Sequence, residues 1–171
     1  SIGADDGSNF SNGATPLFYF ATKASDECFR EYLAVSRLVD MKKLPAYITR
    51  VGSVVKVGMV VKDAATANKE DDDGNIPVHE AARRGDPEVF GLLLEKGGSR
   101  TAVNKRGETT LMHAALSGNA EVLRMAMEGV DPAEIHKSDK KGANVADYAK
   151  RSRNSEVCEI MKKAGAKPTK K

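Results

Sequence analysis

The sequence predicts an all-α fold in which pairs of helices stack side by side into an elongated solenoid. Residues 74–85 recur 33 residues later as residues 107–118, with both glycines and the paired alanines in register. The 171-residue chain is 40% hydrophobic and 30% charged, which excludes a disordered or collagen-like chain. It has no Trp, five Phe and four Tyr, so we expect a core of small and aliphatic side chains between closely packed helices.

The clearest repeat predicts two helices joined by a tight turn. Pro77 suits the first turn of a helix, where its missing N–H costs no hydrogen bond, and Ala81 is small enough for a neighbouring helix to approach closely. Gly85 stands where a left-handed C-cap ends the first helix, and Asp86 can cap the second. We expect residues 92–94, three leucines, to anchor the second helix in the stack.

Residues 76–82 and their copy at residues 109–115 resemble the ankyrin repeat, whose unit is a turn, two antiparallel helices and a projecting loop. Gly118 and Asn119 repeat the signals for the turn and the cap. The resemblance implies an ankyrin-repeat solenoid of about five units. The expected boundaries are a lead-in at residues 1–11, a repeat domain at residues 12–165 with units near 12–40, 41–70, 71–103, 104–138 and 139–165, and a solvated basic tail at residues 166–171.

The first unit, at residues 12–40, matches the repeat through the helix entry Thr15-Pro16-Leu17. It has Phe18 where the ankyrin motif prefers His. We therefore expect a helix pair at the N-terminal end of the stack that departs from the repeat consensus.

The second unit, at residues 41–70, allows two interpretations. Five valines at residues 54–61 favour strands and the glycines weaken a helix, so propensity alone predicts a short strand. A helix that begins after Ser53, a good N-cap residue, instead places Val54, Val57 and Val61 along one face. We expect the helix, because a stacked repeat needs a packed second helix at this place.

The last unit resembles a capping copy that opens at residues 139–142 and ends at residues 156–165. Charge is concentrated in this region. Residues 139–171 hold ten Lys or Arg and four Asp or Glu, a balance of +6, whereas the rest of the chain has a balance of −3. The basic end makes a contact with anions an alternative to a solvated surface.

No catalytic, metal or cofactor site is expected, and the chain is predicted not to be an enzyme. Residues 97–100 lack the Gly-Lys-Ser/Thr ending of a phosphate loop, and there is no nucleophile elbow. The acidic residues 70–73, with Glu80, have the spacing of a calcium loop. Lys69 stands at the first ligand position, however, so we interpret the run as a turn before a helix.

The three histidines have no local metal-ligand spacing. The ankyrin resemblance implies that His79 forms structural hydrogen bonds within and between turns. His113 is shifted by one position from the motif, because Met112 occupies the equivalent of His79, and it is expected to be solvated or to face the partner groove. His136 is expected at the surface of a long loop.

The resemblance implies a protein-binding surface on the concave face, formed by loop tips and the exposed side of each first helix. Arginine forks suit carboxylates, so we expect a protein partner that presents acidic or hydrogen-bond-accepting groups. The residues carried over by motif are Asp72, Asp73, Asn75, Glu80, Arg83, Arg84, Lys105, Arg106, Glu108, His113, Leu116, Ser117, Lys140 and Lys141.

The predicted function is therefore that of a non-catalytic, monomeric protein-interaction module. The alternative is a basic adaptor that contacts nucleic acid or an acidic membrane through the C-terminal repeat, although no aromatic side chains accompany the basic residues for stacking on bases. No apolar stretch reaches the length of a membrane span. Cys28 and Cys158 are expected to be buried thiols outside any disulfide framework, which favours an intracellular, cytoplasmic location.

Overall fold

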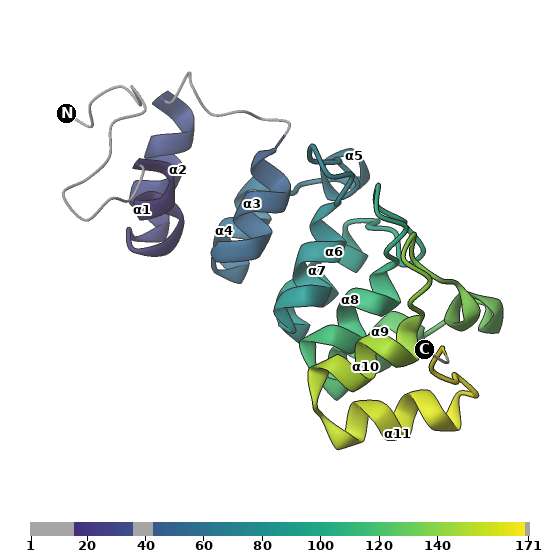
Figure 1. Cartoon of the computed structure of the whole chain (residues 1–171). Coiled ribbons are helices and arrows are strands. Elements are labelled where there is room, and N and C mark those ends of the chain that lie inside the picture. Colours follow the sequence, from purple (N-terminus) through teal and green to yellow (C-terminus); the bar gives the residue numbers. More distant parts are fainter. Residues whose placement is uncertain (1–15, 36–42, 170–171) are drawn as a thin grey trace.

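The computed structural model describes residues 16–35 and 43–169, and these ranges contain helices, turns and loops without a β-sheet (Figure 1). The sequence-based expectation of an all-α stack is confirmed. In chain order the helices are α1 (Pro16–Thr22), α2 (Asp26–Val35), α3 (Leu44–Val51), α4 (Val54–Val60), α5 (Ala64–Ala67), α6 (Pro77–Arg84), α7 (Pro87–Glu95), α8 (Thr110–Ser117), α9 (Ala120–Met127), the 3-10 helix η1 (Pro132–His136), α10 (Val145–Ser152) and α11 (Ser155–Lys163).

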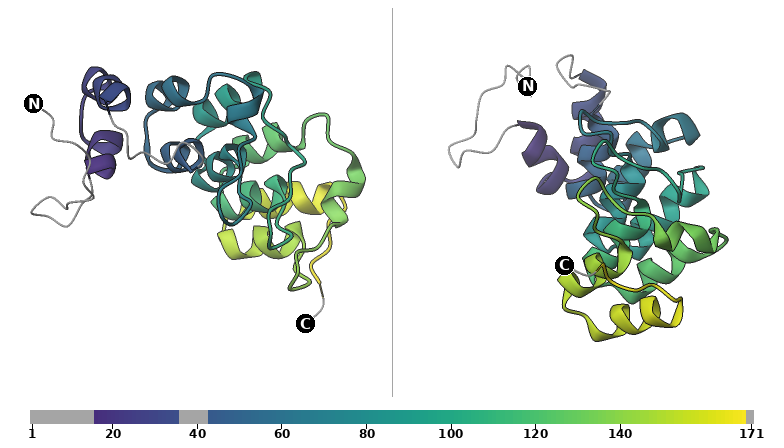
Figure 2. Two further views of the ribbon diagram at one scale, coloured as in Figure 1. Left: turned by 90° about the horizontal axis from the view of Figure 1, so that it is seen from above. Right: turned by 45° about the vertical axis from the view of Figure 1, so that its right-hand side comes forward.

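Successive helix pairs stack in the order of the chain, from α1 and α2 at one end to α10 and α11 at the other (Figures 1 and 2). The first helices α3, α6, α8 and α10 pack against one another in one layer. The second helices α4, α7, α9 and α11 form the other layer. Each pair therefore buries its apolar faces mainly against its neighbours, as in other repeat proteins.

The helix signals of the two clearest repeats act as predicted. Pro77 occupies the first turn of α6. Gly85 and Gly118 end α6 and α8 in the left-handed conformation, with φ of 73° and 75°. The side chains of Asp86 and Asn119 accept hydrogen bonds from backbone N–H groups in the first turns of α7 and α9. These five residues mark where the helices of the two repeats begin and end.

The second unit forms the expected helix α4 and not a strand. The Ser53 hydroxyl accepts a hydrogen bond from the Lys56 backbone N–H at 3.3 Å and caps the helix. Val57 and Val61 are fully buried, while Val54 is half-buried. Packing in the stack thus outweighs the strand propensity of the valines.

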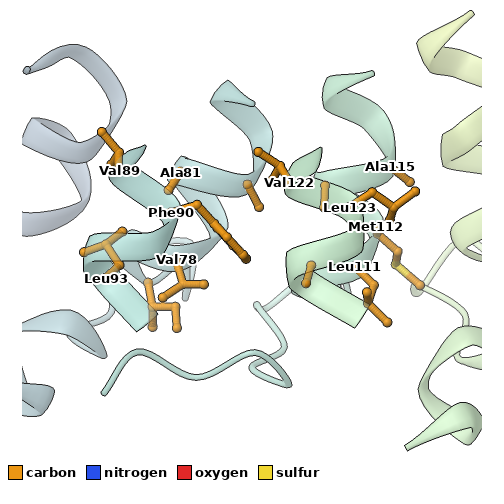
Figure 3. Packing of buried hydrophobic residues seen from close by; sticks show 14 of the residues in the cluster. Val78, Ala81, Val89, Phe90, Leu93, Leu111, Met112, Ala115, Val122 and Leu123 are labelled. Carbon is orange, nitrogen blue, oxygen red and sulfur yellow. The ribbon is translucent and has the colours of Figure 1, made fainter. Parts of the chain in front are cut away.

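The core consists mainly of aliphatic side chains and alanines that interleave between the layers (Figure 3). Phe90 and Leu93 of α7 and Leu123 of α9 are inaccessible to solvent. Leu92 and Leu94 are only half-buried, so Leu93 is the fully buried member of the predicted leucine anchor. The small Ala81 allows α6 to lie close to its neighbours.

Asparagine side chains join neighbouring units, because each donates a hydrogen bond to a backbone carbonyl in the turn of the preceding unit. The Asn119 side-chain amide donates to the Gly85 carbonyl oxygen at 2.9 Å. Asn154 donates to the Gly118 carbonyl oxygen at the same distance. Each asparagine also caps its own helix, so a single side chain fixes both the start of a helix and its place in the stack.

Lys56 joins the first helix pair to the second. This lysine is buried in α4, and its Nζ donates to the carbonyl oxygens of Ala24 at 2.6 Å and Ala21 at 3.3 Å. The two carbonyls lie at and beyond the end of α1, where orphan acceptors are expected. A charged side chain therefore adds hydrogen bonds to the apolar packing at this junction.

The C-terminal segment differs from the expected solvated tail. Ala166 is buried, and the Asn144 side-chain amide donates to the Lys167 carbonyl oxygen at 2.7 Å. The Thr169 hydroxyl donates to Asp147 Oδ2 at 2.8 Å. Residues 166–169 therefore pack against α10, while Lys170 and Lys171 lie outside the described residues.

Two further expectations concern the cysteines and the N-terminal residues. The prediction of buried thiols was wrong for Cys28, which is exposed, and only partly correct for Cys158, which is half-buried. Both cysteines are free. The lead-in at residues 1–11 and the entry residues Asn12 to Thr15 lie outside the described residues.

Candidate functional site

Three loops, at residues 71–75, 104–108 and 139–143, project beside the starts of α6, α8 and α10; we call them the finger loops. Each is closed by the side chain of its first residue. The side-chain oxygens of Asp71, Asn104 and Asp139 each accept hydrogen bonds from two backbone N–H groups later in the same loop. The fingers are therefore built on one Asx-turn pattern.

Backbone hydrogen bonds hold the fingers in register. The Lys105 N–H donates to the Asp73 carbonyl oxygen at 3.0 Å, and the Lys140 N–H donates to the Arg106 carbonyl oxygen at 2.9 Å. Gly74 and Gly107 have positive φ, and a Cβ on either would lie 3.0 Å from the backbone nitrogen of the next finger. Glycine is needed at both positions, because any side chain would clash with this contact.

The finger tips bring six of the predicted contact residues to the surface. Asp72 and Asp73 are exposed on the first finger, Lys105 and Arg106 on the second, and Lys140 and Lys141 on the third. The row thus changes from acidic to basic along the stack.

Several of these exposed charges are already engaged. Lys43 forms an ion pair with Asp72, and Lys105 Nζ donates to the Asp72 carbonyl oxygen at 2.8 Å. Within the part of the chain that the structure describes, the ammonium groups of Lys140 and Lys141 have no hydrogen bond or ion pair. The third finger is therefore the one with two uncommitted cations.

Glu80 lies beneath the row and is buried, in contrast to the predicted surface role. Its Oε1 accepts from Arg50 Nη2 at 2.7 Å, and its Oε2 accepts from Arg83 Nη2 at 2.7 Å. Burial favours the protonated carboxyl, but the two guanidinium groups outweigh it and lower the pKa of Glu80. Arg83 is half-exposed and committed to this pair.

Glu108 centres a second polar cluster between the last two fingers. Its Oε2 accepts from Asn104 Nδ2 at 2.7 Å and from Arg106 Nε at 3.0 Å. The Tyr148 hydroxyl lies 2.7 Å from Asp139 Oδ2 and 3.1 Å from Glu108 Oε1, so it links the two carboxylates. Burial opposes ionisation of Glu108, yet its hydrogen bond from Asn104 and the nearby cations lower its pKa.

His79 has the structural role that the resemblance implied. Its Nδ1 accepts from the Ile76 N–H at 3.1 Å, so the ring carries its proton on Nε2, which donates to the Ala102 carbonyl oxygen at 2.9 Å. Burial lowers the pKa of His79.

His113 is buried, and the expectation that it is solvated or faces the groove was wrong. Its ring lies 5.3 Å from that of His79, and neither ring nitrogen has a hydrogen-bond partner among the described residues. Nε2 lies 3.5 Å from Glu108 Oε2 without the geometry of a hydrogen bond. Burial, followed by the neighbouring His79, lowers the pKa of His113 to about 4.

Asn75 and Arg84 also differ from the predicted contact residues. Asn75 is buried, and its Oδ1 accepts from Asn104 Nδ2 at 2.9 Å, so it links two fingers from within. Arg84 is exposed, but its guanidinium group is already engaged. Its Nη1 donates to the carbonyl oxygens of Thr49 and Gly52 at the end of α3.

Leu116 and Ser117 are half-buried at the end of α8. Leu116 packs against the core, and the Ser117 hydroxyl donates to the Ala114 carbonyl oxygen at 2.7 Å. These two residues therefore lie at the opposite end of α8 from the finger loops. His136 is exposed, as expected, at the end of η1.

The sequence interpretation missed the residues that hold the surface in shape. Asn104, Asp139 and Tyr148 set the fingers but were not among the predicted residues. One signal could have found the first two: an Asp or Asn followed three residues later by Gly recurs at Asp71, Asn104 and Asp139.

A family model described as ankyrin repeats in three copies matches residues 47–139 and again residues 78–171. The chain belongs to the ankyrin-repeat family. These matches cover the units from α3 to α11, which confirms the solenoid inferred from the 33-residue period. Ankyrin repeats are protein-interaction modules and are generally not catalytic.

Curated relatives share part of the repeat region with this ankyrin-repeat chain. Two are named as probable E3 ubiquitin-protein ligases of Oryza sativa subsp. japonica: XBOS32, 40% identical over 38% of this chain, and XBOS33, 43% identical over 31%. A transient receptor potential cation channel subfamily A member 1 homolog of Caenorhabditis elegans is 32% identical over 58% of this chain. The matches span 13%, 10% and 8% of these relatives' own lengths.

No helix in the described ranges is both long and apolar enough to span a bilayer.

Proposed function

We propose that this ankyrin-repeat chain binds the acidic segment of a partner protein, as a monomer, along the finger loops of its concave face. The proposal rests on the row of exposed fingers and above all on Lys140 and Lys141, whose ammonium groups are exposed and uncommitted. Lys105 and Arg106 extend the basic surface along the neighbouring finger. At Lys140 and Lys141 an acidic partner gains charge-assisted hydrogen bonds without breaking an existing pair.

The proposed surface is smaller than the set predicted from the motif. Asn75, Glu80 and His113 are buried and serve the fingers from below. Arg83 and Arg84 are engaged with Glu80 and with the end of α3. Binding is therefore assigned to the tips, and the residues beneath hold the tips in place.

The relatives support a binding role rather than a transferred activity. Their printed names describe two different activities, ubiquitin ligase and cation channel, and in each the matching repeats make up a small share of the protein. The shared segment is consequently better explained by recognition than by either activity.

The test is charge reversal at the third finger. Partners are first captured with the wild-type chain from cells that express it and identified by mass spectrometry, and the leading partner is then titrated. Lys140→Glu with Lys141→Glu should weaken binding at least tenfold, about 1.4 kcal/mol, and leave the melting temperature nearly unchanged, because neither side chain has a partner to lose.

A matched control separates the effect of losing the third-finger lysines from the effect of the change in net charge. Lys62→Glu with Lys163→Glu makes the same change in charge on residues that flank the second layer, and should keep the wild-type affinity. Equal loss in both double variants, or full affinity in the third-finger variant, would show that the fingers are not the contact surface.

The basic-adaptor alternative is tested with the same variants, by measuring their binding to nucleic acid and to acidic membranes. Binding of duplex DNA or of vesicles with acidic lipid should fall steeply with salt if phosphate contacts carry the function. Third-finger dependence of DNA or vesicle binding, with no such dependence for any protein partner, would favour the alternative.

A further inference from the structure

The outward face of the last helix pair contains a hollow of about 410 Å³ that no described element covers. Its floor is apolar and comes from both helices, with Ala146 and Ala149 of α10 and Met161 of α11. The segment from Gly165 to Pro168 forms one wall. Figure 1 shows α10 and α11 at the end of the stack, with no further helix pair beyond them.

The repeat pattern explains why the face is hollow. Cys158 occupies the place held by Phe90 and Leu123 in the two preceding units, at spacings of 33 and 35 residues. Those two side chains are fully buried, whereas Cys158 is half-buried. A smaller side chain at a core position leaves unfilled apolar volume at the end of the stack.

Cations surround this hollow. Lys150 occupies the place of the buried Ala82 and Ala115, and Lys162 that of Leu94 and Met127. Lys150, Lys162 and Lys167 are exposed lining residues, and none of the lining residues in the described part of the chain is acidic. Lys150 and Lys162, in place of the apolar residues of earlier units, keep the face in contact with water, and together with Lys167 they make the rim of the hollow positively charged.

We propose that this hollow, which we call the end pocket, is a second docking site that takes an acidic amphipathic segment of a partner protein. Apolar side chains of the segment fill the space left by Cys158, and carboxylates beside them meet the three lysines. The volume lies in the range of pockets that bury a drug-sized ligand, which is enough for apolar side chains of a bound segment. The site is separate from the finger loops, so it does not depend on the function proposed above.

The probe is a short synthetic helical peptide with leucines along one face and glutamates beside them, titrated by fluorescence anisotropy. Two matched peptides carry lysines in place of the glutamates or serines in place of the leucines. The acidic amphipathic peptide should bind at least tenfold more tightly than either control. Comparable binding of the lysine peptide would overturn the charge argument.

Variants of the chain test whether the acidic peptide binds in the end pocket. Lys162→Glu should weaken the acidic peptide at least tenfold, while Lys163→Glu, on the same helix but outside the lining, should not. Cys158→Phe restores the side chain of an earlier unit and should abolish binding by filling the pocket. If Cys158→Phe does not fold, the lysine pair alone decides, because both positions are exposed.

A thiol readout reports on occupancy. In a Cys28→Ser background, the peptide should slow the reaction of Cys158 with a maleimide, because it covers the thiol. Unchanged labelling at saturating peptide would place the peptide elsewhere and refute the proposal.

Two other occupants would also overturn it. Self-association that Lys162→Glu abolishes in sedimentation would assign the end pocket to a second copy of the chain. Lysine-dependent binding of phosphatidylserine vesicles, with none of the peptide, would assign it to a membrane surface.

Discussion

Buried histidine is the residue-scale feature with the clearest consequence for stability. His113 stays neutral in the folded chain down to a pKa of about 4, because burial and the adjacent His79 oppose its protonation. In the unfolded chain its pKa is about 6.5. Between these values the unfolded state binds the extra proton, so folding stability is lost as the pH falls from about 6.5 to about 4.

His113→Leu should flatten this pH dependence. The shift corresponds to roughly 3 kcal/mol, an upper estimate for one group that faces Glu108 and His79. Leucine forfeits no hydrogen bond, because both ring nitrogens lack a partner among the described residues. Urea melts at pH 6.5 and 4.5 measure the loss, which should be smaller in the variant.

His136→Leu is the matched control, since it removes one imidazole from an exposed position. Glu80 and Glu108, whose pKa values are lowered, destabilise the fold only when the pH falls below their ordinary range near 4.5. A slope above pH 4.5 that His113→Leu does not alter would refute the assignment to this histidine.

The burial of His113 could not be foreseen from the ankyrin motif, because the motif places its structural histidine at the position of Met112. The preceding unit brings the His79 ring to 5.3 Å from the ring of His113, and this contact between units does not follow from local spacing. By contrast, the role of His79 was predictable, since its bond to the Ile76 N–H is local.

At the scale of the helix, α4 shows how packing and propensity compete. The cap at Ser53 and the buried Val57 were readable from the sequence, since both follow from local spacing. The sequence did not reveal that Lys56 would be buried, because its acceptors at Ala21 and Ala24 lie more than thirty residues away. Local signals define the helices; contacts between units decide which polar residues they bury.

The two glycines near α4 should respond in opposite directions to alanine. A Cβ at Gly58 would meet only Leu92 Cδ2 at an ordinary 3.7 Å, so Gly58→Ala should stabilise α4 by about 0.5–1 kcal/mol. A Cβ at Gly52 would lie 2.8 Å from the Ile48 carbonyl oxygen, so Gly52→Ala should destabilise. Hydrogen exchange of the α4 amides measures both.

The same exchange data compare the units. We expect residues 41–70 to open more readily than residues 71–129 in the wild-type chain, because α4 combines glycine with β-branched residues. Gly58→Ala should reduce the difference in hydrogen-exchange protection between the two segments. Equal protection of both segments in the wild type would contradict the assignment of weakness to α4.

For the whole molecule, stability depends on the junctions between units, and the junction between the second and third units lacks the asparagine donor of the two junctions that follow it. Asn119 and Asn154 donate to the turn carbonyls of Gly85 and Gly118. At the equivalent place the third unit has Asp86, which has no amide donor. Arg84 supplies the missing donor to the Gly52 carbonyl and forms an ion pair with Asp86.

Arg84→Ser should therefore loosen α3 and α4 from the rest of the stack. It leaves the Thr49 and Gly52 carbonyls without their side-chain donor, at a cost of about 1–2 kcal/mol. Adding Asp86→Asn recreates the Ser-Gly-Asn sequence of residues 117–119 and should restore most of the lost stability. Asp86→Asn alone keeps Arg84 and should change little. Urea melts and hydrogen exchange of α3 report the effect; failure of Asp86→Asn to rescue Arg84→Ser would show that the guanidinium acts through its own packing and not as a substitute for the junction amide.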